Sequence, residues 1–477
     1  MVSTAPRSVL TSGRSRLGSG NRNSRQGRYG QAAKARSCKP ESRRSIFAVS
    51  YRYFGLSEQG TDVRTEFIAG VTTFLTMVYI VFVNPIILGK TGMDRGAVFV
   101  ATCVAAAVST LVMACYANYP IALAPGMGIN AFFAVTVVLT YNYTSQQALA
   151  AVFCSGVLFF LISVFPIRQY VIDAIPQNLK LAVSAGVGLF LGIIALEKAK
   201  VIVDHPATLV TLGDLTKPVP VLMLLGFVLI AGLNYRRVLG GTLIGIIMVT
   251  AISLPFGLSQ FNGVVSVPPS LAPTFLQLDF SRISELTFLI VVFSILFVDV
   301  FDNAGTLIGV THRTGLMKKG KLARMKQALI SDSFAAMFGA LIGTSTTTSY
   351  IESAAGVSAG GRTGLTAVFV ALFFVLALFF APLAGMVPAY ASAAALLYVA
   401  CVMTRGLAEI DWDDVTEYAP AVVTAITMPL TYSIATGIGL GFITYALAKI
   451  VSGKAGEASP AVVILAILFA TKFAVTG

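Results

Sequence analysis

Two aspartates stand inside an apolar stretch of this chain, at positions 299 and 302 of the segment 297–309. Residues three apart share one face of a helix, so Asp299 and Asp302 point to the same side. Glu352 and Asp332 also lie in apolar surroundings. A carboxylate at membrane depth costs about 3 kcal/mol or more and therefore faces a cavity or a pathway. These acids indicate a transported solute held by hydrogen bonds, together with a proton.

Two short segments combine Gly, Pro or Thr with one strongly polar side chain. They are Ala124-Pro-Gly-Met-Gly-Ile-Asn-Ala131 and Thr346-Thr-Thr-Ser-Tyr-Ile-Glu-Ser353, and their alignment on Ile places Asn130 opposite Glu352. Interrupted segments at corresponding places in two halves mark the midplane site of a transporter. Further candidate contacts are Asn84 and Thr346, and the positions of close backbone approach are Gly126, Gly128 and Gly305.

The composition requires membrane helices to carry these groups. The chain has 477 residues, of which 56% are hydrophobic and 12% charged, and its mean hydropathy is +0.82. Continuous apolar runs of about 20 residues indicate helices rather than a barrel. We expect an all-α integral membrane protein of about fourteen segments. These lie at about 65–89, 97–117, 121–140, 147–166, 178–197, 218–234, 237–255, 287–311, 325–343, 345–359, 364–385, 388–404, 417–450 and 459–476. The thirteenth contains Pro429 and Gly437, which predict a division into two half-helices.

Charged loops orient the chain. Basic residues follow spans 4, 6 and 8, above all in the segment 312–326, which carries six Lys and Arg. The positive-inside rule makes this side cytoplasmic, with both chain ends on it. Because each half has an odd number of spans, the second half must enter the membrane with the opposite orientation. We expect a basic tail over 1–48, a first repeat over 49–258 and a second repeat over 259–477.

Most of the net charge of +13 comes from the tail, which contributes +10. Nucleic-acid binding by the body of the protein is therefore unsupported. The tail has no apolar core of a signal peptide. It fits a disordered basic arm, sequence upstream of the true start, or an organellar transit peptide. The cysteines show no metal-ligand spacing and no nucleophile–base constellation is visible, so we expect no metal, no cofactor and no enzyme activity.

Several segments together carry a family resemblance. They are 64–79, Val83-Asn-Pro85, 124–133, and the stretches around Asp299 and Glu352. From about Phe54 to Ala474 the chain resembles the nucleobase–cation symporters of the xanthine/uracil permease superfamily, in particular the guanine/hypoxanthine/adenine permease branch. The resemblance implies fourteen spans in two inverted repeats, and a core domain that moves against a gate domain. It also implies short paired strands in segments 3 and 10, with substrate between segments 3, 8 and 10.

The resemblance assigns roles by position. The purine-contacting acid falls on Glu352, the acid of segment 8 on Asp299 or Asp302, and the amide on Asn130. Proton handling falls to Glu352, Asp302 or Asp332. Alternatives stay open: Glu352 as a helix cap, either aspartate of segment 8 as a structural hydrogen-bonding group, Asp332 as the partner of a buried Ser or Thr, and Asn84 as a residue that shapes span 1.

The resulting hypothesis is a secondary transporter that imports purine nucleobases with protons by alternating access. Sodium is the alternative cation, and the family suggests a homodimer. Short loops favour the inner membrane of a bacterial cell. Two other hypotheses remain: an anion or sulfate-type carrier of the same architecture, and a membrane-embedded enzyme or receptor. Like charges repel, so the clustered carboxylates argue against an anion.

Overall fold

The computed structural model describes residues 53–165, 176–261, 263–312, 317–318, 321–322 and 324–476. The chain divides into two units, Met1–Ala48 and Val49–Gly477. The expected basic tail therefore lies outside the described residues. The side chain of Asp302 and the surroundings of Gly305 also lie outside them, although helix α11 runs through both positions.

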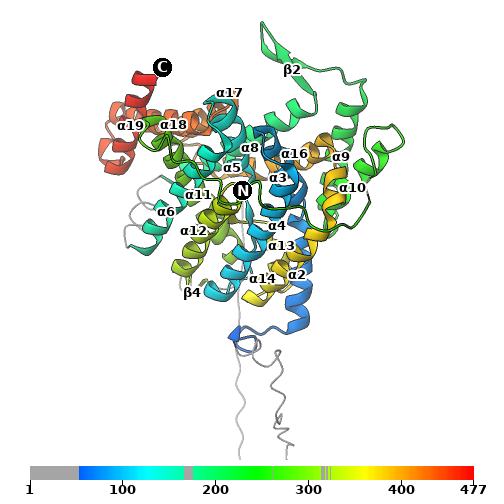
Figure 1. Ribbon diagram of the computed structural model, residues 1–477. Helices are drawn as coiled ribbons and strands as arrows, with labels where there is room; N and C mark the ends of the chain where they lie inside the picture. Colours follow the sequence, from blue (N-terminus) through cyan, green and yellow to red (C-terminus); the bar gives the residue numbers. More distant parts are fainter. Residues whose placement is uncertain are drawn as a thin grey trace, which may run out of the picture. The chain divides into compact units, whose positions relative to one another are not determined.

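The described part of the chain is mostly helical (Figure 1). The helices of the first half are α2 (Val63–Met77), α3 (Ile80–Leu88), α4 (Arg95–Val112), α5 (Met127–Ala131), α6 (Ser145–Val164), α8 (Gln177–Lys198), α9 (Pro218–Tyr235) and α10 (Gly241–Ser253). Those of the second half are α11 (Leu286–His312), α12 (Met325–Ile342), α13 (Ser353–Ser358), α14 (Gly364–Ala377), α15 (Ala381–Met386), α16 (Ala389–Thr404), α17 (Val415–Leu430), α18 (Ile434–Val451) and α19 (Pro460–Thr476).

In the part of the chain that the structure describes, six short strands form three antiparallel pairs. Two of these pairs are hairpins, made by β2 (Ile202–His205) with β3 (Leu209–Leu212) and by β4 (Met317–Lys318) with β5 (Lys321–Leu322). The third pair joins β1 (Leu123–Pro125) to β6 (Thr347–Ser349), which are more than two hundred residues apart in the sequence. Only this third pair lies between predicted membrane segments of the two halves.

The length and apolar composition of the helices agree with the prediction of a membrane protein. Within the described residues, eight helices are long and apolar enough to cross a bilayer. All fourteen predicted segments coincide with a helix, a pair of helices or a strand and helix, while their grouping into two inverted seven-span repeats stays a prediction. The thirteenth segment is divided into α17 and α18, as expected. Gly437 does not cause this division, however, because it lies inside α18 and packs closely against Met428 of α17.

The predicted strands of segments 3 and 10 are confirmed, and neighbouring side chains satisfy their backbone groups. Pro125 has no N–H to donate, so a continuous helix is disfavoured there. In the antiparallel register Leu123 pairs with Ser349 and Ala124 with Thr348. The Thr110 hydroxyl accepts from the Leu123 N–H at 2.8 Å and donates to its carbonyl at 3.1 Å. Extended backbone at membrane depth needs such internal partners, because lipid offers none.

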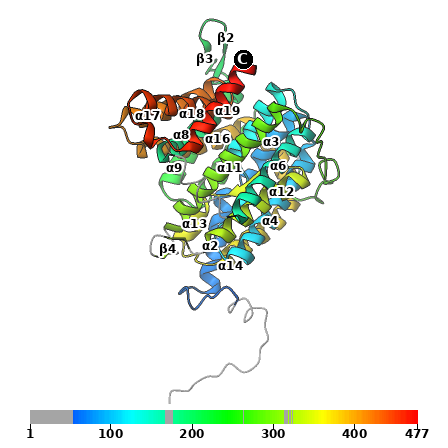
Figure 2. The same ribbon diagram turned by 90° about the vertical axis from the view of Figure 1, so that its left-hand side faces the viewer.

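The helices pack in two groups around these strands. Helix α14 packs on α2 and α4, and α12 packs on α4 and α6. Helix α8 packs on α16 and α17, and α9 packs on α10 and α16. Figures 1 and 2 show α4, α12 and α14 side by side, and α17, α18 and α19 together. Helices α5 and α11 contact both α8 and the first group, so the strand region lies at the junction of the two groups.

Candidate functional site

The first component of the candidate site is the carboxylate of Glu352, the residue immediately before α13. The Tyr79 hydroxyl donates a hydrogen bond of 2.7 Å to its Oε1 atom. Tyr79 lies at the junction between α2 and α3, where the first membrane span is interrupted. The side chain of Glu352 accepts no capping hydrogen bond from α13. Glu352 therefore stands at the N-cap position of α13 without a side-chain capping bond, and its carboxylate is bound by Tyr79 instead.

The second component is Asp299 of α11, which is fully buried. Asn303, one turn further along α11, donates from Nδ2 to Asp299 Oδ1 at 2.9 Å. The Oδ1 atom of Asn303 accepts from the Thr348 hydroxyl at 2.7 Å and from the Ser349 N–H at 2.9 Å. Asp299 is thereby connected to strand β6 through one amide group.

The third component is Asp332 of α12, whose Oδ1 atom accepts from the Ser349 hydroxyl at 2.7 Å. Both residues are buried. This bond is the buried pairing with Ser or Thr that was one of the two interpretations of Asp332. Ser349 therefore binds Asn303 through its backbone and Asp332 through its side chain, so both α11 and α12 are connected to β6.

The amides of Asn130 and Asn84 contact the segment that precedes β6. The Ser345 hydroxyl donates to Asn130 Oδ1. Asn84 Nδ2 donates to Thr102 Oγ1 at 2.7 Å and to Thr344 Oγ1 at 2.9 Å. Three buried atoms there have no hydrogen-bond partner in the described part of the chain: Asn130 Nδ2, Asn84 Oδ1 and Thr346 Oγ1. Such atoms are available to a polar ligand or to water.

Two of the three predicted glycines allow close approach, and the side-chain surroundings of the third, Gly305, are outside the described residues. The Gly126 N–H donates to the Thr346 carbonyl at 2.9 Å, and a Cβ atom on Gly126 would lie 2.7 Å from Thr348 Cγ2. A Cβ atom on Gly128 would collide with Val187 of α8. Gly126 thus permits the strand pairing, and Gly128 permits contact between the two helix groups.

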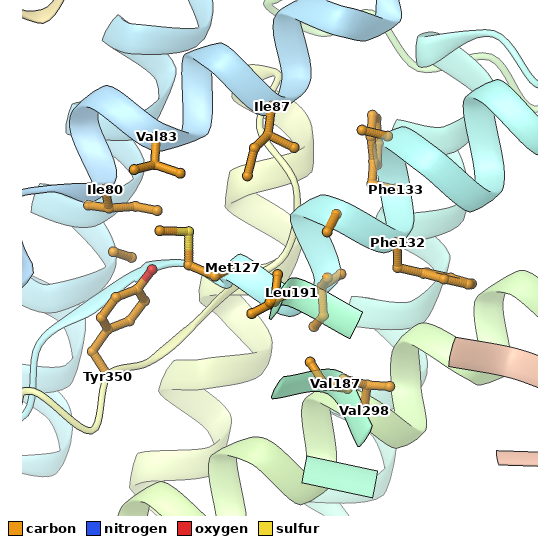
Figure 3. Packing of buried hydrophobic residues seen from close by; sticks show 14 of the residues in the cluster. Ile80, Val83, Ile87, Met127, Phe132, Phe133, Val187, Leu191, Val298 and Tyr350 are labelled. Carbon is orange, nitrogen blue, oxygen red and sulfur yellow. The ribbon is translucent and has the colours of Figure 1, made fainter. Parts of the chain in front are cut away.

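A small cavity of about 20 Å³ lies at this contact, between α5, α8, α11 and α16. Its lining residues are Gly126, Gly128, Ile129, Val183, Ser184, Val187, Val298 and Met403. Figure 3 shows the apolar packing of this region, with Val187 close to Val298, both of which line the cavity. The volume suffices for about one water molecule. A bicyclic ligand would fit only if α8 and α16 moved away from α5 and α11.

The sequence analysis did not single out Asn303 and Tyr79, which complete the site, and it did not predict the partner of Ser345. Asn303 orients toward Asp299, Tyr79 binds Glu352, and Ser345 binds Asn130. For Asn303 a signal existed, because an amide four residues after an aspartate can bond to it on the same helix face. For Tyr79 and Ser345 the partner is more than two hundred residues away, and no local spacing indicates it.

The broken segments, the apolar helices and the buried acids define a helical membrane transporter. Solved structures share its fold. The transmembrane domain of the cyanobacterial bicarbonate transporter BicA superposes with a TM-score of 0.59 at 15% identity, covering 83% of this chain and 97% of that one. SLC26A9 superposes with a TM-score of 0.61 at 12% identity, covering 85% of this chain and 69% of that one. At these identities the likeness concerns the fold alone.

The chain belongs to the permease family (Xan_ur_permease), whose model matches residues 64–475. It is 49% identical over 422 residues to the adenine permease AdeP of Escherichia coli (strain K12), covering 88% of this chain and 95% of that one. It is 43% identical over 433 residues to the guanine/hypoxanthine permease PbuG of Bacillus subtilis (strain 168), covering 88% of this chain and 98% of that one. The predictions of an integral membrane protein, of a transporter rather than an enzyme, and of this family are confirmed.

Proposed function

We propose that this permease imports purine nucleobases together with protons. The relatives named as adenine and guanine/hypoxanthine permeases support the substrate class. The observation that carries the proposal is the β1–β6 pairing, which gathers Glu352, Asp299 and Asn130 around one pair of strands at the junction of the two helix groups. The purine would bind there, with Asn84 and Thr346 as further polar contacts.

The chemistry of these side chains suits a neutral purine. A carboxylate accepts hydrogen bonds from ring and exocyclic N–H groups, and an amide offers one donor face and one acceptor face. In a site of low dielectric such bonds are stronger than in water, and a lone negative charge is costly. A proton taken up by Glu352, Asp302 or Asp332 during binding would remove that cost, which couples the proton to the purine.

Movement between the two helix groups would provide alternating access. In this proposal α2–α6 and α11–α14 form the core domain, and α8–α10 and α16–α19 form the gate domain. The cavity of about 20 Å³ between α5 and α8 corresponds to a closed junction. Separation of the domains on one side at a time would expose the purine first to the outside and then to the cytoplasm. The inverted repeats over 49–258 and 259–477 would supply the two related halves.

The remaining proposals concern the orientation, the membrane, the assembly and the alternative coupling ion. The basic loops support an orientation with both chain ends in the cytoplasm. We place the protein in the inner membrane of a bacterial cell, with a homodimer as the assembly and sodium as the alternative coupling ion.

One uptake experiment tests the proposal. Cells that lack their own purine carriers are given labelled hypoxanthine, with and without a protonophore, and with adenine, guanine, xanthine or uracil as competitors. Uptake that purines block and the protonophore abolishes is the expected result. Replacement of the proton gradient by a sodium gradient separates the two cations. If uptake continued in a Glu352→Ala, Asp299→Ala double variant at normal membrane abundance, the site would be wrong.

An anion carrier is the second candidate, because the fold is shared with a bicarbonate transporter. The grouping of Glu352, Asp299 and Asp332 near β6 disfavours it, since an anion would meet like charges. Labelled sulfate and bicarbonate in the same cells are the control. Uptake of either one without any purine uptake would favour this second function.

A further inference from the structure

Asn303 makes three hydrogen bonds, and two of them are to the strand that crosses the site. It is fully buried on α11. Its Oδ1 atom accepts from Thr348 Oγ1 at 2.7 Å and from the Ser349 backbone N–H at 2.9 Å, while its Nδ2 atom donates to Asp299 Oδ1 at 2.9 Å. Among the described residues of the site, Asn303 is the side chain that bonds both to another residue of α11 and to β6.

The chemistry of the strand decides which way this amide points. A backbone N–H can only donate, so the atom of Asn303 that faces Ser349 must be the carbonyl oxygen. The amide nitrogen is then turned toward Asp299, and it too can only donate. Asp299 Oδ1 must therefore be an acceptor. Because the hydroxyl oxygen of a protonated carboxyl group is a weak acceptor, a proton carried by Asp299 belongs on Oδ2.

From this chain of donors and acceptors we propose that Asn303 is a positioning residue for purine binding. It fixes the plane of the Asp299 carboxylate relative to β6, because Oδ1 is bound to the amide that β6 holds in place. This inference rests on the proposed function. It adds that β6 and Asp299 form one hydrogen-bonded unit through Asn303. Strand β6 ends three residues before Glu352.

Among the described side chains, few charged groups surround Asn303; Asp302, which precedes it on α11, has a side chain outside the described residues. Asp299 lies on its own helix, Asp332 of α12 is reached through Ser349, and Glu352 precedes α13. Of the other elements that contact α11, the elements α5, α6 and β6 contain no Asp, Glu, His, Lys or Arg. Helices α8 and α18 carry theirs close to their ends, at Lys180, Glu197, Lys198 and Lys449. Within the described residues, Asp299 is the carboxylate that the amide contacts directly.

Replacement of Asn303 by aspartate distinguishes a role in positioning Asp299 from a role in packing alone. Asn303→Asp keeps the shape and the two bonds accepted from Thr348 and Ser349, but it places a second carboxylate against Asp299. The pair repels when both groups are ionised, whereas one shared proton restores a donor toward Asp299, so the binding deficit should be smaller at pH 5.5 than at pH 7.5. Asn303→Ala removes the donor at every pH. Asn234→Asp on α9 is the matched control, since Asn234 bonds only to Ile230 and Thr242 of its own neighbourhood.

The measurement is binding of labelled hypoxanthine, with guanine and adenine in parallel, to the purified full-length protein at both pH values. We expect Asn303→Ala to weaken binding about 10- to 100-fold at either pH, the range of a hydrogen bond to a charged group. Asn303→Asp should show a similar loss at pH 7.5 and recover most of it at pH 5.5 relative to wild type. Asn234→Asp should follow wild type.

Three results would overturn the inference. One is wild-type binding by both Asn303 variants. Another is a deficit of Asn303→Asp that is the same at both pH values, which would mean a structural role. The third is failure of both variants to fold while Asn234→Asp folds, which would make Asn303 a folding residue. If the wild-type protein bound no purine at all, the proposed function itself would be wrong, and this outcome is distinct from the other three.

Discussion

The Tyr79 hydroxyl donates to Glu352 Oε1 at 2.7 Å, so the break in the first membrane span is connected to the start of α13 across 273 residues of sequence. The bond therefore holds a carboxylate at the junction of the two helix groups, where the proposed purine site lies.

Removal of this donor should weaken transport. We expect Tyr79→Phe to raise the KM for hypoxanthine about tenfold, because a hydrogen bond to a charged group contributes about 1.5–3 kcal/mol. Uptake kinetics at matched membrane abundance measure it. Tyr235→Phe is the control, since Tyr235 is 90% exposed. An unchanged KM in Tyr79→Phe would mean that this bond does not orient Glu352 for substrate.

A methyl group at position 126 should push apart the paired strands β1 and β6. Its Cβ atom would lie 2.7 Å from Thr348 Cγ2, and Thr348 belongs to the strand that pairs with β1. Overpacking of this kind costs about 1–3 kcal/mol. We expect Gly126→Ala to lower the thermal unfolding midpoint in detergent and to reduce uptake. Gly232→Ala on α9, where a Cβ atom meets nothing within 4 Å, should leave both unchanged or raise stability slightly.

Glu66 is a buried acid that we expect to stabilise the fold without contacting substrate. Its carboxylate accepts from the backbone N–H groups of Arg362 at 3.0 Å and Thr366 at 3.1 Å, and from the Thr366 hydroxyl at 2.5 Å. It thus holds α2 against the start of α14. Glu66→Gln turns an NH₂ group toward one of these donors, which should cost about 1–3 kcal/mol.

Thermal unfolding and uptake together check this prediction. Glu66→Gln should lower the unfolding midpoint and leave the KM of the folded fraction unchanged. Glu58→Gln, at an exposed acid nearby, should change neither. A raised KM in Glu66→Gln, with normal stability, would place Glu66 in the transport pathway instead.

An ion pair outside the membrane helices should make stability depend on acid pH. Lys454 Nζ lies 2.6 Å from Asp414 Oδ2, and hydrogen bonds from Lys454 and Thr416 hold the pKa of Asp414 below its ordinary value. A carboxyl group with a lowered pKa in the folded state contributes stability that is fully present above its unfolded pKa, about 3.9. That contribution is lost as the pH falls below this value toward the folded pKa.

Unfolding midpoints measured from pH 7 to pH 3 test this sign. Asp414→Asn should be less stable than wild type at pH 7, and the difference should shrink below about pH 4. Asp413→Asn is the control, because the Asp413 side chain is exposed and makes no ion pair within the described residues. A difference between Asp414→Asn and wild type that stayed constant down to pH 3 would contradict the prediction.

Local chemistry was sufficient to predict the interrupted segments. Pro125 and the glycines on either side of Met127 disfavour a continuous helix in any context. The run of Thr and Ser from position 344 to 349 favours extended backbone for the same kind of local reason. Alignment of the two segments, in contrast, did not predict contacts. Asn130 and Glu352 correspond in that alignment, yet Asn130 bonds to Ser345 and Glu352 bonds to Tyr79.

What the sequence by itself determined is the presence of long apolar helices, the interruption of the segments around Pro125 and Thr346, and the burial of Asp299 and Asp332. These properties depend on apolar length and on local backbone chemistry, both of which a single chain displays. Only the tertiary structure decided that Asn303 faces Ser349, that Asp332 bonds to the same serine, and that Gly128 meets Val187. Those pairs arise from the packing of spans that are distant in sequence, and spacing along one helix contains no information about them.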